Sequence, residues 1–293
     1  MANIFKSHVK RINIRIEYVF LYIMVLLLVS FTSLPLIYMI STAFKPIDEL
    51  FIFPPRYFVN RPTLQNFYDL LIAMGTSTVP FTRYLFNSLF TTVTSVILTV
   101  IVSGMGAYGL VKHKPKGSGA IMAVVIAALM FSPHVTQIPS YLVVQKLGLL
   151  NTYGALIIPK IAVAYNFFLM ERFTQQIPNE LLEAARIDGA HELKIFWSIV
   201  MPLLKPAWAT LVVFSFVSSW NDYFSPLVFI TSQALKTMPL ALQTIAGGTA
   251  TVEISRAGAV AAASFVMTVP TIIIFTFMQA KVMQTMAYSG IKA

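Results

Sequence analysis

The sequence predicts an all-α, polytopic membrane protein whose six helices form a single transmembrane domain over residues 1–293. Hydrophobic residues make up 57% of the chain and charged residues only 11%, whereas a soluble domain has roughly 25% charged residues. The apolar residues gather into six runs of about twenty residues or more, the length that an α-helix needs to cross a bilayer. The runs do not alternate as barrel strands do, so helices must satisfy the backbone polar groups in hydrocarbon.

The first run, residues 18–44, has no charged residue and follows a basic segment at residues 6–15. A secretory signal peptide is the alternative, but it would have a shorter apolar region that ends at small residues. Pro35 and Tyr38 stand where that cleavage site would fall. We therefore expect this run to be the first membrane span.

The second and third runs, residues 84–111 and 119–142, flank a short basic turn. That turn contains Lys112, Lys114 and Lys116. Two helices joined by so short a loop run antiparallel, so the segment predicts a helical hairpin.

The last three runs are residues 150–170, 206–230 and 257–280. The fourth run contains Pro159 and Lys160 near its middle, and the fifth contains an acidic residue. Proline removes a helix hydrogen bond, and a lysine is costly in hydrocarbon unless its long side chain reaches the interface. The fourth and fifth spans are therefore predicted less directly than the other four.

Lysine and arginine are unequally divided between the two sides that these spans define. Of the 21 residues, 13 fall on the side of the N-terminus, seven fall on the other side, and Lys160 lies within the fourth run. Because cytoplasmic loops are enriched in these residues, we expect a multi-pass protein of the cell (inner or cytoplasmic) membrane with both termini in the cytoplasm. The formal net charge is +10, but no basic face is interleaved with aromatic residues, which disfavours nucleic-acid binding.

Catalytic and metal sites are not predicted. The chain has no cysteine, and its four histidines show no metal-ligand spacing. The segment from Gly104 to Gly109 matches G-x-G-x-x-G, but the nucleotide-binding motif needs a preceding strand. Within an apolar run, such small residues indicate close helix packing instead, and Gly258 and Ala262 in the last run predict the same.

The polar segment between the fourth and fifth runs, residues 171–205, contains start and stop signals for two short helices. Pro178 suits the first position of a helix, and Gly189 can end that helix in a left-handed conformation. A second helix can follow with one apolar stripe made of Leu193, Phe196, Trp197 and Val200. The segment therefore predicts a rigid cytoplasmic projection that docks another molecule.

This segment also contains the pattern EAA, three residues, G, nine residues, I-x-x-P. The residues that carry it are Glu183, Ala184, Ala185, Gly189, Ile199 and Pro202. The pattern resembles the EAA loop of bacterial ABC-importer permeases, in which Leu usually stands at the place of Met201, a volume-conserving change. The segments 41–46, 219–222 and 290–292 extend the resemblance to the second-permease branch of the carbohydrate-uptake (maltose-type) family.

The resemblance implies the type I fold of ABC-importer permeases and ATP-driven transport, with a sugar or oligosaccharide as the expected cargo. It implies four partners besides lipid: a homologous second permease, two cytoplasmic ATPase subunits, and an extracytoplasmic substrate-binding protein. This chain has no phosphate loop, so ATP and Mg²⁺ are expected on the ATPases, and the chain itself is expected to be neither an enzyme nor a cofactor carrier. The residues implied to couple it to an ATPase are Glu183, Ala184, Ala185, Arg186, Asp188, Gly189, Ile199 and Pro202.

Other interpretations remain open. Glu183 and Arg186 could simply form a surface pair at i and i+3. An ion-gradient-driven secondary transporter would show intramembrane carboxylates and symmetric broken helices, and a membrane scaffold subunit would need no binding protein. Neither of these other classes has a positive signal in the sequence.

Polar residues at membrane depth are candidates for a substrate pathway. Asp222 follows Trp220 and Asn221 near the outer end of the fifth run, and Asn87 lies near the outer end of the second. Aromatic and amide side chains suit the apolar faces and hydroxyl groups of a sugar. A belt of aromatic residues at the membrane interface gives the same local sequence, so both interpretations stay open.

Overall fold

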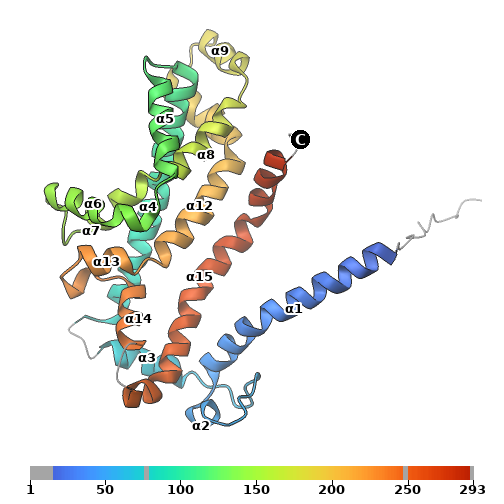
Figure 1. Cartoon of the computed structure of the whole chain (residues 1–293), viewed down its shortest axis with the longest axis vertical. Helices are drawn as coiled ribbons and strands as arrows, with labels where there is room; N and C mark the ends of the chain where they lie inside the picture. Colours follow the sequence, from blue (N-terminus) through green and yellow to red (C-terminus); the bar gives the residue numbers. More distant parts are fainter. Residues whose placement is uncertain (1–15, 76–78, 247–249, 291–293) are drawn as a thin grey trace, which may run out of the picture.

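The chain folds into helices that pack into an elongated bundle, with one long helix leaving it at an angle (Figure 1). The computed structural model describes residues 16–75, 79–246 and 250–290, so the basic N-terminal segment lies outside the described residues. Within the described residues there is no strand. The expectation of an all-α protein is confirmed.

The first half of the chain forms α1 (Ile16–Phe44), α2 (Ile47–Leu50), α3 (Gln65–Gly75), α4 (Phe81–Tyr108), the π-helix η1 (Gly109–His113), α5 (Ser118–Leu129), α6 (Pro133–Lys146) and α7 (Tyr153–Ile161). The second half forms α8 (Ala164–Gln175), α9 (Asn179–Ile187), α10 (Glu192–Ile195), the π-helix η2 (Phe196–Val200), α11 (Met201–Leu203), α12 (Lys205–Trp220), α13 (Phe224–Phe229), the 3₁₀ helix η3 (Gln233–Leu235), α14 (Met238–Ala246) and α15 (Ala250–Gly290).

Three helices of the described chain are long and apolar enough to cross a membrane unbroken. They cover Tyr18–Phe44, Phe81–His113 and Ala257–Met283. Three bent helix pairs also pass the same test, which gives up to six crossings if each pair is one span. The six predicted spans and their limits stay predictions, because length and composition alone define these candidates.

The fold differs from six straight spans in its three bent pairs. The predicted third span, residues 119–142, is α5 followed by α6 at an angle of 117°. Pro133 stands at the start of α6, and the residue before a proline is driven out of the helical region. The second helix therefore starts in a new direction.

The predicted fourth and fifth spans are also broken. Residues 150–170 contain α7 and α8, which meet at 42° after Ala162. The third bent pair lies where the predicted fifth span begins, since Glu192–Leu203 meets Lys205–Trp220 at 79°. Within the predicted span 206–230, α12 ends at Trp220 and the short helix α13 starts only at Phe224. The breaks at Ala162 and after Trp220 leave backbone outside a regular helix, which membrane proteins tolerate where it lines a cavity.

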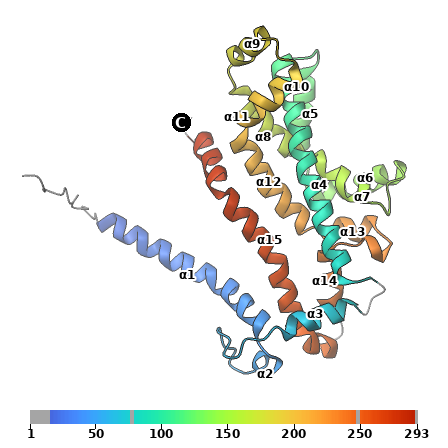
Figure 2. The same ribbon diagram turned by 180° about the vertical axis from the view of Figure 1, so that it is seen from behind.

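The helix α4 is the centre of the bundle, since it packs against α7, α8 and α12, and α12 in turn packs against α15. The helix α1 contacts α15 and α3 and otherwise diverges from the bundle (Figures 1 and 2). Its candidate span has none of its most apolar window buried. The short helix α9 lies at one end of the molecule, and α2 and α3 lie at the other (Figure 2).

Candidate functional site

The helix α9 has the limits that its sequence predicts. Pro178 caps it in an extended conformation, with ψ of 138°, and the helix runs from Asn179 to Ile187. Gly189 follows in the left-handed region with φ of +77°. A Cβ atom added to Gly189 would meet no heavy atom within 4 Å, so glycine is favoured here by its backbone conformation rather than by lack of space.

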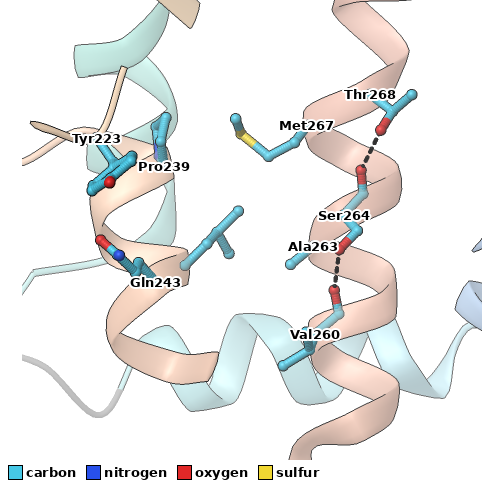
Figure 3. Close-up of a pocket in the computed structure, with 9 residues that line it drawn as sticks. Tyr223, Pro239, Gln243, Val260, Ala263, Ser264, Met267 and Thr268 are labelled. Atoms are coloured by element: carbon cyan, nitrogen blue, oxygen red, sulfur yellow. Dashed lines mark hydrogen bonds between the residues drawn. The ribbon is translucent and has the colours of Figure 1, made fainter. Parts of the chain in front are cut away.

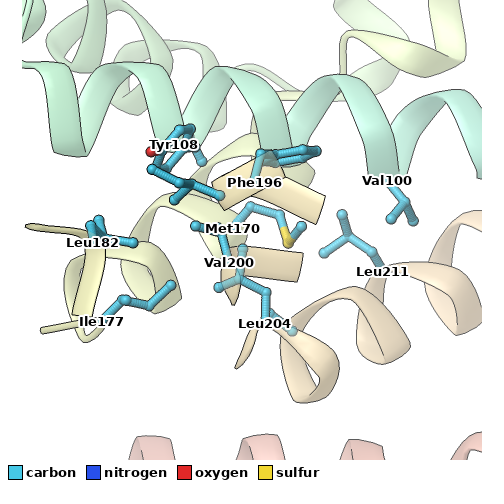
Figure 4. Close-up of a cluster of buried hydrophobic side chains, with 12 residues drawn as sticks. Val100, Tyr108, Met170, Ile177, Leu182, Phe196, Val200, Leu204 and Leu211 are labelled. Carbon is cyan, nitrogen blue, oxygen red and sulfur yellow. The ribbon is translucent and has the colours of Figure 1, made fainter. Parts of the chain in front are cut away.

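The buried side chain of α9 is Leu182. Leu182 is 1% exposed and packs in a cluster with Tyr108 of α4 and Phe196 of η2. Figure 4 shows these side chains pointing toward Met170 of α8 between the surrounding helices. The helix is therefore packed onto the bundle through its inner face.

The residues of the EAA pattern divide between the surface and this cluster. Ala185 and Ile199 are partly buried against the cluster. The exposed members are Glu183, Ala184, Arg186, Asp188, Gly189 and Pro202. The outer surface of α9 also carries two large apolar side chains, Leu181 and Ile187, which are 47% and 86% exposed.

Arg186 forms an ion pair with Glu192 of α10 rather than with Glu183. Its Nε lies 2.9 Å from Oε1 of Glu192, and the Tyr108 hydroxyl donates to Oε2 of Glu192 at 2.6 Å. Nε2 of His113 lies 3.4 Å from the same oxygen. The hydrogen bonds from Arg186 and Tyr108 lower the pKa of the Glu192 carboxyl, so Glu192 joins α9, α4 and η1 as a carboxylate.

The ion pair between Glu183 and Arg186, kept open from sequence, does not occur among the described residues. Sequence analysis also missed Glu192, because the contact with Tyr108 spans 84 residues and no local spacing predicts it. Lys112 adds a further link, since its Nζ donates to Oδ1 of Asn179 at 3.0 Å.

The apolar stripe predicted after Gly189 is split by the π-helix η2. Phe196 and Val200 are buried, whereas Leu193 and Trp197 are 57% and 50% exposed. A π-helix bonds residue i to i+5 rather than to i+4, so residues that share one face of an α-helix no longer do so. The prediction of a single stripe was therefore wrong.

A second candidate site lies in the interior of the bundle, along α4. Polar residues recur at every fourth position on one face of this helix, and all are buried: Asn87, Thr91, Ser95, Thr99 and Ser103. Residues four apart share one face of an α-helix, so the sequence carried this signal although it was not used. The hydroxyl of Thr99 donates to the Lys160 backbone oxygen at 3.2 Å, which joins this face to α7.

Lys160 and Asp222 form an ion pair, with Nζ and Oδ2 separated by 2.9 Å. Nζ of Lys160 also donates to the Ser219 hydroxyl at 3.2 Å. Oδ1 of Asp222 accepts a hydrogen bond from the backbone N–H of Ser225 at 3.0 Å. The two ionisable residues that the sequence placed near membrane depth are therefore each other's partners.

Two cavities whose lining residues are mainly polar meet at this ion pair. The larger, of about 430 Å³, is lined by Asn221, Asp222 and Lys160 together with residues of α6 and α13. The smaller, of about 200 Å³, lies between α4, α8 and α12 and is lined by Ser95, Thr99 and Lys160. A third cavity, of about 400 Å³ and mostly apolar, lies between α14 and α15 (Figure 3).

The two other predicted pathway residues have different surroundings. Asn87 is fully buried, its amide nitrogen donates to the backbone oxygens of Ala234 and Lys236, and its Oδ1 accepts from the Tyr153 hydroxyl. Trp220 is also fully buried, and its Nε1 donates to the Met267 backbone oxygen at 2.8 Å. Neither residue lines the two polar cavities, so their role in a pathway stays a prediction.

Two of the three glycines in the G-x-G-x-x-G segment serve helix packing, as predicted. A Cβ atom on Gly106 would lie 2.9 Å from the Phe167 ring, and one on Gly104 would lie 3.2 Å from Cε of Met170. Both contacts join α4 to α8. Gly109, by contrast, has nothing within 4 Å of such an atom, so packing does not account for the third glycine.

Comparison with known proteins places this geometry among transport proteins. The family described as "Binding-protein-dependent transport system inner membrane component" matches residues 96–286, which include α9 and both members of the Lys160–Asp222 ion pair. The protein LplC of Bacillus subtilis is 36% identical over 221 residues, which cover 74% of this chain and 71% of that protein.

Two further similarities cover more of the chain. The arabinooligosaccharides transport system permease protein AraQ of Halalkalibacterium halodurans is 30% identical over 88% of this chain and 90% of its own length. A subunit in the crystal structure of a bacterial ABC transporter involved in the import of the acidic polysaccharide alginate matches with a TM-score of 0.76 and 26% identity. That match covers 91% of this chain and 97% of the other.

Proposed function

The chain belongs to the family of binding-protein-dependent transport system inner membrane components, and from that premise we propose how it is coupled to ATP and what it carries. As a permease subunit of an ABC importer it is a membrane protein and a transport subunit rather than an enzyme. It works with an ATPase and a substrate-binding protein.

We propose that this permease pairs with a homologous second permease and two ATPase subunits that bind ATP and Mg²⁺. The helix α9 and the residues up to Gly189 form the contact with one ATPase. Three features support this contact: the end position of α9, the exposed Leu181 and Ile187, and the small exposed Ala184 between them. Closure of the ATPases would then bias the permease between two conformations.

The orientation that we propose places α9 and both chain termini in the cytoplasm. The C-terminal end of α15 and the η1 end of α4 point toward the same end of the molecule as α9, whereas α1 ends at Phe44 on the opposite side (Figure 1). Lysine and arginine counts support the same orientation. The helix α9 would then face the compartment that contains ATP.

We propose a sugar or an oligosaccharide as the cargo, with Asn221 and Asp222 on its path and with Asn87 and Trp220 holding the helices around it. The names of the similar proteins support a saccharide, and the polar cavity beside α13 supports a path. A secondary transporter would also have broken helices and an intramembrane carboxylate, and this chain has both. Family membership is what favours the ATP-driven importer.

The single observation that carries the coupling proposal is the position of α9, which is packed through Leu182 and exposes its EAA residues. Because the chain contains no cysteine, an Ala184→Cys variant has one reactive thiol in this subunit. We expect a short bifunctional thiol reagent to link it to a cysteine in the ATPase within the assembled transporter. Gln233→Cys, exposed in η3, is the matched control and should not link. An equal yield for both variants would contradict the proposal.

A further inference from the structure

We propose that the ion pair of Lys160 and Asp222 is a charge-cancelling gate on the cargo path, which admits uncharged saccharides and opposes anionic ones. This inference rests on the proposed saccharide transport. It adds the charge of the cargo and assigns a role to two residues whose pairing sequence analysis did not predict.

The ion pair joins two helix breaks. Lys160 lies in the last turn of α7, directly before the break at Ala162, and Asp222 lies between α12 and α13. Broken helices that meet inside a membrane bundle are typical of transport sites. A change in either break therefore changes the distance between the two charges.

The ion pair also lies between two cavities. Lys160, Val163 and Ser218 line both the cavity of about 430 Å³ and the cavity of about 200 Å³. The side chains of Lys160 and Asp222 are only 21% and 16% exposed, so their direct contact is largely shielded from solvent. With the pair closed, the two cavities are separate; with the pair open, they can form one continuous polar path.

An unpartnered hydroxyl group points to a polar occupant of the smaller cavity. Ser95 lines this cavity, its side chain is nearly fully buried at 2% exposure, and its Oγ has no hydrogen-bond partner within the described structure. Buried polar groups are nearly always hydrogen-bonded. A water molecule or a cargo hydroxyl in the cavity would satisfy Ser95, and Asn166 and Ser215 offer further polar groups there.

The charges that line the larger cavity cancel, because Lys160 and Asp222 are the only ionisable Lys, Arg, Asp or Glu residues among its described lining. Its other polar side chains carry hydroxyl and amide groups: Thr136, Gln137, Ser140, Ser218, Asn221, Tyr223 and Ser225. Such groups, with aromatic side chains beside them, suit an uncharged sugar. A carboxylate on the cargo would compete with Asp222 for Lys160 and leave one buried negative charge uncompensated, which is costly.

The similar proteins suggest one neutral and one acidic saccharide as test compounds. One relative is named for arabinooligosaccharides, and the similar solved structure is of an importer of the acidic polysaccharide alginate. The test uses Ser140→Cys, which places a single cysteine in the larger cavity of the cysteine-free chain. The rate at which this cysteine reacts with an uncharged methanethiosulfonate is measured in the assembled transporter in proteoliposomes. Saturating arabinotriose, which is neutral, should slow the reaction by about fivefold or more. Trimannuronate, which is acidic, should change the reaction rate by less than about twofold. Both limits follow from the fraction of sites that a bound saccharide occupies and so shields from the reagent.

Asp222→Asn is the variant that separates a charge effect from a general loss of the site. It leaves Lys160 unpaired, so trimannuronate should now protect Ser140→Cys about as well as arabinotriose does in the parent. The single change Asp48→Asn removes an exposed ion pair with Arg61 elsewhere and should alter neither result. Equal protection by both trisaccharides in the parent, protection by neither, or an Asp222→Asn variant that still excludes trimannuronate would overturn the proposal.

The gate itself is tested by a cysteine in the smaller cavity. Ser95→Cys should react slowly with a reagent added from outside, and the double change Lys160→Gln and Asp222→Asn should speed that reaction by about fivefold or more, because the pair no longer closes the path. An unchanged rate would overturn the gate. ATP-driven uptake of arabinotriose is measured in parallel, so a transporter that moves no saccharide at all is recognised as a failure of the proposed function instead.

Discussion

Gly189 shows how one backbone angle sets the coupling helix. Its φ of +77° is a conformation that costs other residues roughly 1–2 kcal/mol, and asparagine adopts it more readily than branched residues do. We expect Gly189→Val to shift the chain after α9 and to lower ATP-driven uptake more than ATP hydrolysis. Gly189→Asn is the control that keeps the angle, so it should retain most of the uptake. The ratio of uptake to hydrolysis in proteoliposomes measures both.

The open space around Gly189 is what makes this comparison informative. A side chain there meets no neighbour, so steric size alone predicts no difference between valine and asparagine. If the two variants lost coupling equally, the left-handed conformation would not be the property that matters at this position.

Gly258 differs from Gly189, because a neighbouring side chain rather than the backbone angle favours glycine there. A Cβ atom there would lie 2.2 Å from Oδ1 of Asn66, whose amide nitrogen donates to the backbone oxygens of Ala43 and Lys45 at 3.0 and 2.7 Å. Gly258→Ala must therefore displace Asn66 and should destabilise the junction of α1, α3 and α15 by about 1–3 kcal/mol. A lower melting temperature of the purified permease would show this.

Gly119→Ala is the matched control for that measurement. A Cβ atom at Gly119 meets nothing within 4 Å and its φ is not in the left-handed region, so alanine should leave the melting temperature unchanged or raise it slightly. A Gly258→Ala protein as stable as the Gly119→Ala protein would show that Asn66 moves at little cost.

Among the helices, α9 and α4 are linked through Glu192. Its carboxylate holds Arg186 and Tyr108 at 2.9 and 2.6 Å, so we expect Glu192→Gln to loosen α9 from the end of α4. The measurement is hydrogen exchange of the α9 backbone, which should become faster. Because the pKa of Glu192 is lowered in the folded protein, the parent loses this contact only as the pH falls through that lowered pKa.

Glu180→Gln, an exposed change in the first turn of the same helix, controls for charge alone. Glu180 forms no ion pair within the described residues, so the substitution should leave hydrogen exchange of the last turn of α9 as it is. Equal acceleration by the two substitutions would mean that net charge, and not the contact with α4, stabilises the helix.

Local sequence signals correctly predicted the helix ends and the long apolar helices that depend on neighbouring residues alone. Pro178 and Gly189 fix the two ends of α9, and uncharged runs predicted α1, α4 and α15 closely. The sharp turn at Pro133 and the π-helix η2 were not predicted. A proline can kink a helix or begin a new one, and no spacing in the sequence distinguishes the π-helix from an α-helix.

The polar face of α4 could have been predicted and was not. A residue such as Ser95 looks unremarkable in an apolar run, and its position is informative only when the spacing of four from Thr91 and Thr99 is counted. The ion pair of Lys160 and Asp222 could not be found in that way. Its members are 62 positions apart in the chain, and only the packing of two broken helices brings them together.

At the scale of the whole molecule, α1 gives the reason for expecting a second permease. Its apolar side chains remain exposed along most of its length, because the helix diverges from the bundle (Figure 2). Lipid can cover such a surface on its own. A homologous second permease packed against α1 would also explain why the helix is held away from its own bundle.

Orientation is the property of the whole molecule on which the coupling proposal depends. Ala184 and Gln233 are exposed on helices that contact opposite ends of α4, since Lys112 after its last turn binds α9 and Arg83 in its first turn binds η3. A membrane-impermeant maleimide should therefore label Ala184→Cys only in inside-out vesicles and Gln233→Cys only in right-side-out vesicles. Because the parent chain has no cysteine, it is the blank for both measurements. Labelling of Ala184→Cys from the outside would place α9 away from cytoplasmic ATP. An ATPase bound to α9 could then no longer drive transport, whatever the geometry of the loop.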